Sequence, residues 1–125
     1  MDIDEIEDLV KQTVEELPEE FKSALDNVDI LVEDWPTQED LRSIFAHPGV
    51  TLFGLYRGIP KTKRITSNYN AVLPDKIVIF AGPIFRFSPT LDAAKKQIKN
   101  TVLHELGHYF GMSEVAIRKA QRKYQ

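Results

Sequence analysis

Apolar positions in the first part of the chain recur at steps of three and four residues. They form one stripe, made up of Ile3, Ile6, Val10, Val14 and Leu17. This period predicts an amphipathic helical region from Ile3 to about Asp26. Pro18 interrupts that region because proline has no N–H to donate, and the two glutamates after it suit the start of a second helix.

Three later stretches are short, rich in β-branched residues and partly alternating, which is typical of strands. We predict strands at Val28–Glu33, Val50–Tyr56 and Lys76–Gly82. Thr37, with Asp40 three residues later, resembles an N-cap and predicts a helix between the first two strands. A polar, basic loop is expected from Arg57 to about Tyr69. Gly82-Pro83 should close the third strand, and residues 84–87 read as a short apolar connector.

The longest predicted helix opens after Ser88-Pro89-Thr90 and runs to about Phe110, with Gly111 as its expected stop. On a helical wheel one broad face is apolar and should lie against the sheet. That face holds Leu91, Ala94, Ile98, Val102, Leu106 and Tyr109. An adjacent face holds Gln97, Thr101, His104, His108 and Gly111. A second stripe that carries two histidines needs a reason, and a metal ion supplies one.

A further short helix is expected after Ser113. Together these elements predict an α+β fold, in which a short mixed sheet packs on one long helix with helices at both ends of the chain. A length of 125 residues suits one modest core, so we expect a single domain over residues 1–125.

Composition narrows the classes of function. The net charge of −3 gives no electrostatic case for binding nucleic acid or an anionic membrane. The chain has no cysteine, so the available metal ligands reduce to His, Asp and Glu. Its acidic N-terminus lacks the pattern of a secretion signal, and no apolar stretch is long enough to span a bilayer. We therefore expect a soluble, cytoplasmic protein, whose oligomeric state the sequence leaves open.

The run HELGHYFGMSE near the C-terminus carries the candidate chemistry. His104 and His108 are four residues apart, so on a helix both imidazoles can reach one ion. Glu105 lies about 100° round the helix from His104, close enough to reach a water on that ion. An HExxH string on a helix, with glycine in the eighth place and a carboxylate in the eleventh, is poorly explained by chance.

A third metal ligand can be sought by elimination. Glu114 is the only acidic residue after Glu105, and Gly111 can turn the chain back because it tolerates positive φ. The rival ligand is His47, which lies in a distant His-Pro-Gly sequence. We favour Glu114. Three protein ligands leave a position for water, which is the mark of a catalytic zinc site.

The expected reaction is attack of a metal-activated water on a carbonyl, with Glu105 as the general base. The developing oxyanion needs hydrogen-bond donors, and no candidate has a firm claim to that role. The candidates are Tyr69, Tyr109, Arg57, Lys61, Lys63 and Arg64. A peptide substrate could be held by an edge strand, and the stretch Lys76–Gly82 suits either that role or a core strand.

The motif, together with LFGLYRGIP and LPDKIVIFAGPI upstream, resembles the small bacterial zincin-like metallopeptidases, also called minimal metalloproteases. The resemblance covers nearly the whole chain. It implies a compact α/β zincin core, with one Zn²⁺ per chain held by His104, His108 and Glu114, and with Glu105 as the base. Metzincins proper usually place His or Asp where this chain has Glu114. They also carry a methionine turn after the motif, and no methionine follows Glu114 here.

Three functions compete at this point. The first is a zinc metallopeptidase acting on an unidentified peptide or protein. The second is a non-catalytic module in which a metal ion is structural and stabilises the fold. The third is a metal-free interaction protein. Two histidines and one carboxylate also suit iron, and Mn²⁺ or Ni²⁺ stay open, but the adjacent Glu105 favours zinc.

Overall fold

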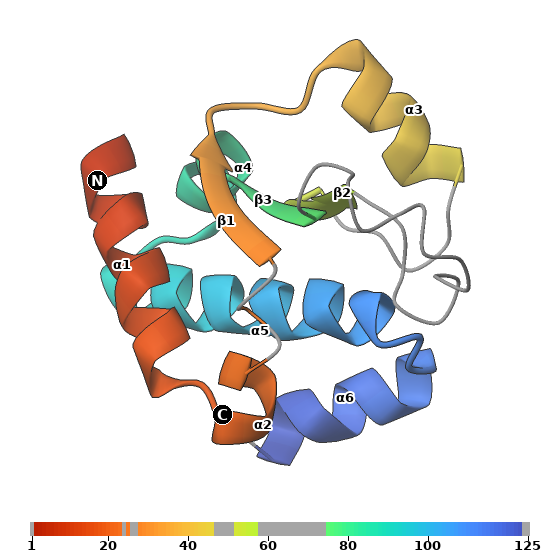
Figure 1. Ribbon diagram of the computed structural model, residues 1–125. Helices are drawn as coiled ribbons and strands as arrows, with labels where there is room; N and C mark the ends of the chain where they lie inside the picture. Colours follow the sequence, from red (N-terminus) through yellow and green to blue (C-terminus); the bar gives the residue numbers. More distant parts are fainter. Residues whose placement is uncertain (1, 24, 26–27, 47–51, 58–74, 124–125) are drawn as a thin grey trace.

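The computed structural model describes residues 2–23, 25, 28–46, 52–57 and 75–123 (Figure 1). Within them the fold is α+β, as predicted. The helices are α1 (Ile3–Glu16), α2 (Glu19–Lys22), α3 (Gln38–Ala46), α4 (Ala81–Phe87), α5 (Leu91–Tyr109) and α6 (Glu114–Lys123). The strands are β1 (Val28–Glu33), β2 (Gly54–Arg57) and β3 (Asp75–Phe80). None of these helices is both long and apolar enough to cross a membrane.

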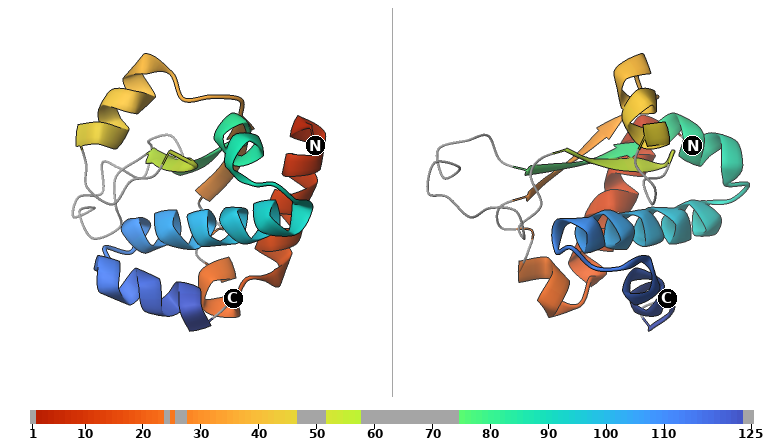
Figure 2. Two further views of the ribbon diagram at one scale, coloured as in Figure 1. Left: turned by 180° about the vertical axis from the view of Figure 1, so that it is seen from behind. Right: turned by 90° about the vertical axis from the view of Figure 1, so that its right-hand side faces the viewer.

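The described strands form a mixed sheet in the order β1-β3-β2. β1 runs parallel to β3, with Ile30 opposite Ile77, and β2 runs antiparallel to it, with Tyr56 opposite Ile77. α5 lies along one face of the sheet and α3 lies over the other, while α1 and α6 pack beside α5 (Figures 1 and 2). The second half of the long helix, from Thr101 to Gly107, is buried throughout.

Alternation along β3 divides the core between the two faces of the sheet. Ile77 and Ile79 belong to the large cluster with α1 and α5, and Val78 and Phe80 belong to a smaller cluster with α3. All four side chains are fully buried. Such a near-continuous apolar run is expected of a strand that is covered on both faces. β3 is therefore a central strand of the described sheet, so of the two alternatives the core strand is confirmed and the substrate-holding edge strand is not.

Most helix boundaries follow the signals in the sequence. The Thr90 side chain accepts a hydrogen bond of 3.1 Å from the N–H of Ala93 and caps α5, as predicted. Thr37 and Asp40 form a reciprocal capping box at α3, because each side chain accepts from the other residue's N–H. At the other end of α5, Gly111 takes φ 70°, the left-handed conformation that favours glycine after a helix.

Two predicted elements differ in the structure. Residues 81–87 form α4 instead of the end of a strand and a connector. Pro83 is tolerated because it lies in the first helical turn, where its missing N–H has no partner to lose. Gly82 lies against Trp35, since a Cβ on it would be 2.2 Å from the indole ring. This contact joins residues far apart in the sequence, so a local pattern could not reveal it.

Smaller differences concern β2 and α5. β2 begins at Gly54, later than the predicted start at Val50, which lies outside the described residues, and Arg57 belongs to it and not to a loop. Leu91 is 50% exposed although its place on the wheel predicts a core position. It is the first residue of α5, where the helix begins beyond the sheet (Figure 1). That residues 1–125 form a single domain stays a prediction.

Candidate metal centre

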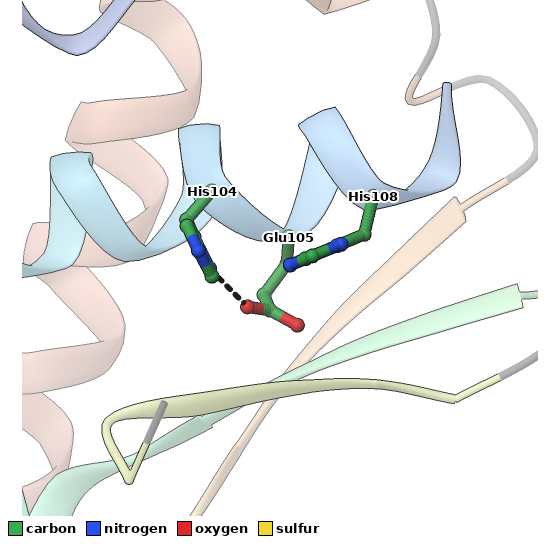
Figure 3. A group of neighbouring side chains, drawn as sticks. All are labelled: His104, Glu105 and His108. Carbon is green, nitrogen blue, oxygen red and sulfur yellow. Dashed lines mark hydrogen bonds and ion pairs between the residues drawn. The ribbon is translucent and has the colours of Figure 1, made fainter. Parts of the chain in front are cut away.

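α5 brings the residues of the HExxH string together on the side that faces the strands (Figure 3). One nitrogen or oxygen atom from each of His104, Glu105 and His108 lies within 4.8 Å of the others. The two imidazole rings are 4.6 Å apart, edge to face at 86°. The expected proximity of the two histidines is confirmed. His104 and Glu105 are buried, whereas His108 is partly exposed.

The Glu105 carboxylate is held by two partners. Oε1 accepts a hydrogen bond of 2.9 Å from the backbone N–H of Tyr56 in β2. Oε2 lies 2.8 Å from Nδ1 of His104. The side chain has no exposed surface. An edge strand and a neighbouring imidazole therefore fix the orientation of this carboxylate. The contact to Tyr56 has no signal in the sequence because its donor is a backbone N–H.

A glycine allows β2 to come this close to α5. A Cβ on Gly54 would lie 2.4 Å from Cγ2 of Thr101, which is well inside normal contact. Thr101 is one helical turn before Glu105, and Gly54 is two residues before Tyr56, on the same side of its strand. Glycine at position 54 thus permits the approach that brings the Tyr56 N–H to Glu105.

α6 brings a second carboxylate to the histidines. Its first residue is Glu114, and the preceding Ser113 caps it by accepting a hydrogen bond from Ala116 N–H. Glu114 Oε1 lies 3.3 Å from Nε2 of His104 and 3.6 Å from Nε2 of His108. Within the described part of the chain this oxygen is buried and makes no hydrogen bond. A buried carboxylate oxygen without a partner is costly, so this position suits a cation.

The electrostatics of the cluster also favour positive charge. Burial by itself would lower the pKa of His104, but the adjacent carboxylates of Glu105 and Glu114 outweigh that effect and raise the pKa above its ordinary value. Neither carboxylate forms an ion pair with a lysine or arginine among the described residues. A divalent cation between these side chains would supply the charge that they lack.

Of the other predicted site residues, the structure describes only Arg57 and Tyr109. His47 is outside the described residues, and so are Lys61, Lys63, Arg64 and Tyr69. The Arg57 guanidinium pairs with Glu33 and Asp40, and these contacts do not bring it to the histidines. The Tyr109 ring is buried in the core and lies 5.8 Å from the ring of Tyr56.

Comparison with known proteins agrees with this geometry. The sequence matches the zincin-like metallopeptidase family over residues 25–124. That range includes the three described strands and the whole of α5 and α6. No individually curated protein matches the chain. Because the match covers well over half of its length, the chain belongs to the zincin-like metallopeptidase family.

Proposed function

We propose that this protein hydrolyses peptide bonds as a zinc metallopeptidase, with His104, His108 and Glu114 as the ligands of one Zn²⁺. The observation that carries the proposal is the buried Oε1 of Glu114, which makes no hydrogen bond in the described part of the chain and lies beside the Nε2 atoms of both histidines. Zinc accepts imidazole nitrogen and carboxylate oxygen as ligands. Membership of the zincin-like family supports a metal of this kind.

Glu114 and Glu105 have different roles in this proposal: Glu114 binds the metal and Glu105 does not. By distance alone, Glu105 forms the tightest group with the histidines. Both of its oxygens already have partners, however, and it faces the Nδ1 side of His104. Glu114 faces the Nε2 side of that ring. A histidine that binds a metal through one nitrogen commonly donates the other N–H to a carboxylate, which is the relation of His104 to Glu105.

The chemistry then rests on Glu105. A zinc ion bound by the three ligands would lower the pKa of a water and polarise the substrate carbonyl. Glu105 takes the proton of the attacking water and can return it to the leaving nitrogen. Because the Tyr56 N–H holds one of its oxygens, the carboxylate keeps one orientation through this exchange.

A structural role for the ion is the second candidate, and one observation favours it. Glu105 also ties β2 to α5, so it contributes to the fold whether or not it moves a proton. A bound ion would join α5 to α6 in the same way. The two functions make different predictions for activity.

Elemental analysis tests the metal site first. We expect one zinc per chain in protein purified without a histidine tag or chelator, and a strong loss in Glu114→Ala. Glu15→Ala removes an exposed glutamate of α1 and should leave the zinc content unchanged. Equal zinc in wild type and Glu114→Ala would exclude Glu114 as a ligand. Absence of zinc in all three proteins after zinc is supplied would overturn the proposal.

Hydrolysis of a peptide library by wild type and Glu105→Gln separates the two functions. We expect activity to fall by roughly 10²–10⁴-fold, as for loss of a general base, with zinc retained. Glutamine cannot accept from both Tyr56 N–H and His104 Nδ1, so the thermal stability of the variant must be measured beside its activity. Zinc-loaded wild type without any chelator-sensitive hydrolysis would favour the structural role.

A further inference from the structure

Gly107 lies inside the HExxH string, where no side chain could be accommodated. It is buried on α5, and a Cβ added to it would lie 2.4 Å from Cγ1 and 2.7 Å from Cδ1 of Ile117. Ile117 cannot easily yield this space. It is 1% exposed, and a β-branched side chain in a helix has essentially one χ1 rotamer. A methyl group at position 107 would therefore push α6 away from α5.

The position of α6 matters because of the residue at its first turn. Glu114 precedes Ile117 by three residues, so the two side chains lie on one face of α6. The first reaches the histidine nitrogens while the second packs on Gly107. The separation of the two helices at Gly107 therefore sets how far the Glu114 carboxylate reaches toward His104 and His108.

The backbone of Gly107 contributes to the same geometry. Its carbonyl accepts a hydrogen bond of 2.9 Å from Met112 N–H, and the carbonyl of His108 accepts one of 3.0 Å from Gly111 N–H. These bonds close the turn between the two helices. At the far end of α6, the Gln121 side chain donates to the Asn100 carbonyl at 2.8 Å. α6 is thus held at three levels along α5, and the contact at Gly107 lies closest to the site.

We propose that Gly107 is a positioning residue: by admitting Ile117, it places the Glu114 carboxylate within reach of the metal. This inference rests on the proposed role of Glu114 as a ligand. Metal coordination tolerates displacements of only about 0.5 Å, so a small shift of α6 is enough to weaken the site.

The test uses three variants of the full chain: Gly107→Ala, Ile117→Ala and the double variant. Zinc affinity is measured by competition with a chromogenic chelator, and folding is checked by circular dichroism. We expect Gly107→Ala to weaken zinc binding by about 10-fold or more. Ile117→Ala removes the obstructing atoms, so the double variant should bind zinc within about threefold of Ile117→Ala alone. Two results would overturn the inference. One is a zinc affinity in Gly107→Ala equal to that of wild type, and the other is zinc binding in the double variant as weak as in Gly107→Ala.

Urea unfolding of the metal-free proteins provides a readout that does not depend on zinc. Alanine is the better helix former, so Gly107→Ala should stabilise the chain wherever Ile117 is absent and destabilise it wherever Ile117 is present. This reversal of sign is the mark of the proposed contact, and the same sign in both backgrounds would contradict it. If wild type binds no zinc, the proposed function fails, while the reversal still tests whether Gly107 sets the position of α6. If Gly107→Ala does not fold, the comparison of the double variant with Ile117→Ala decides the matter.

Discussion

Two clusters of charged side chains lie on opposite faces of the sheet, and they differ in the source of their positive charge. On the α3 face, the Arg57 guanidinium lies 2.6 Å from Asp40 and 3.2 Å from Glu33. On the α5 face, Glu105 and Glu114 approach two histidines, and no lysine or arginine of the described chain pairs with either glutamate.

The difference lies in whether each cluster neutralises its own carboxylates. The Arg57 cluster contains its own cation, so its carboxylates are satisfied and it joins β2 to β1 and α3. In the other cluster, a buried oxygen of Glu114 makes no hydrogen bond within the described residues and has only histidine nitrogens close to it. Spacing in the sequence does not separate the two cases, because both combine carboxylates with nitrogen-bearing side chains. The balance of charge within each cluster does separate them.

Glu114→Lys should have the largest effect, because it gives the second cluster an internal cation. We expect zinc affinity to fall by at least about 100-fold, since a ligand is lost and a like charge is added. The unfolding free energy of the metal-free chain should stay within about 1 kcal/mol of wild type, as for a partly exposed ion pair. Zinc titration and urea unfolding measure the two quantities. If Glu114→Lys still bound zinc, the lack of an internal cation would not explain why this cluster binds a metal.

Supplying zinc to the wild-type chain should have the next largest effect. At 100 times its dissociation constant, a ligand that binds only the folded state adds about 2.7 kcal/mol. In a chain of this size we expect a rise in melting temperature on the order of 10 °C, reversed by a chelator. Arg57→Met should show the same increment, because its cluster takes no part in binding zinc. No response to zinc in differential scanning calorimetry would count against a folded-state site.

Arg57→Met tests the cluster on the α3 face, in which Arg57 neutralises Asp40 and Glu33. Methionine keeps much of the apolar length of arginine but leaves the buried Asp40 carboxylate without its guanidinium. We expect a loss of about 1–3 kcal/mol in urea unfolding, with zinc content unchanged. Glu33→Gln is the matched control, since the Glu33 side chain is 37% exposed and its loss should cost less than about 1 kcal/mol. Equal losses in the two variants would mean that Asp40 does not depend on Arg57.

The pH dependence of stability should be the smallest effect. Burial opposes the charged form of Asp40, but the hydrogen bonds from Thr37 and Arg57 outweigh burial and hold its pKa below the ordinary 3.8. A depressed folded-state pKa gives stability that is complete above 3.8 and is lost as the pH falls through the lower value. Urea unfolding between pH 7 and pH 2 should show this loss in wild type. In Asp40→Asn the loss of unfolding free energy at low pH should be smaller. An equal loss in wild type and Asp40→Asn would mean that other carboxylates cause it.

Much of the fold could be predicted from local signals. The break at Pro18, the capping box of Thr37 and Asp40, and the ends of α5 at Thr90 and Gly111 each depend on chemistry within a few residues. α4 and the central place of β3 could not be predicted, because both depend on which distant segments pack together.

The candidate site divides in the same way. His104 and His108 lie together because helical spacing alone brings them together. The proximity of Glu114 follows from the turn at Gly111, which the sequence also indicates. The hydrogen bond from Tyr56 N–H to Glu105 could not be predicted, since any residue other than proline presents the same backbone group. The roles of these side chains as ligands and base stay predictions until metal binding is measured.

The two halves of the site differ in the length of chain that separates their partners. His104 and Glu114 are 10 residues apart, whereas Glu105 and Tyr56 are 49 apart. The entropy lost on closing a loop grows with its length, and a helix–turn–helix segment closes early in folding. The proposed metal ligands can therefore assemble on α5 and α6 before β2 docks, so an ion could act as a nucleus on which the sheet later assembles. In that order of events, the proposed base Glu105 gains its contact with Tyr56 only when β2 docks.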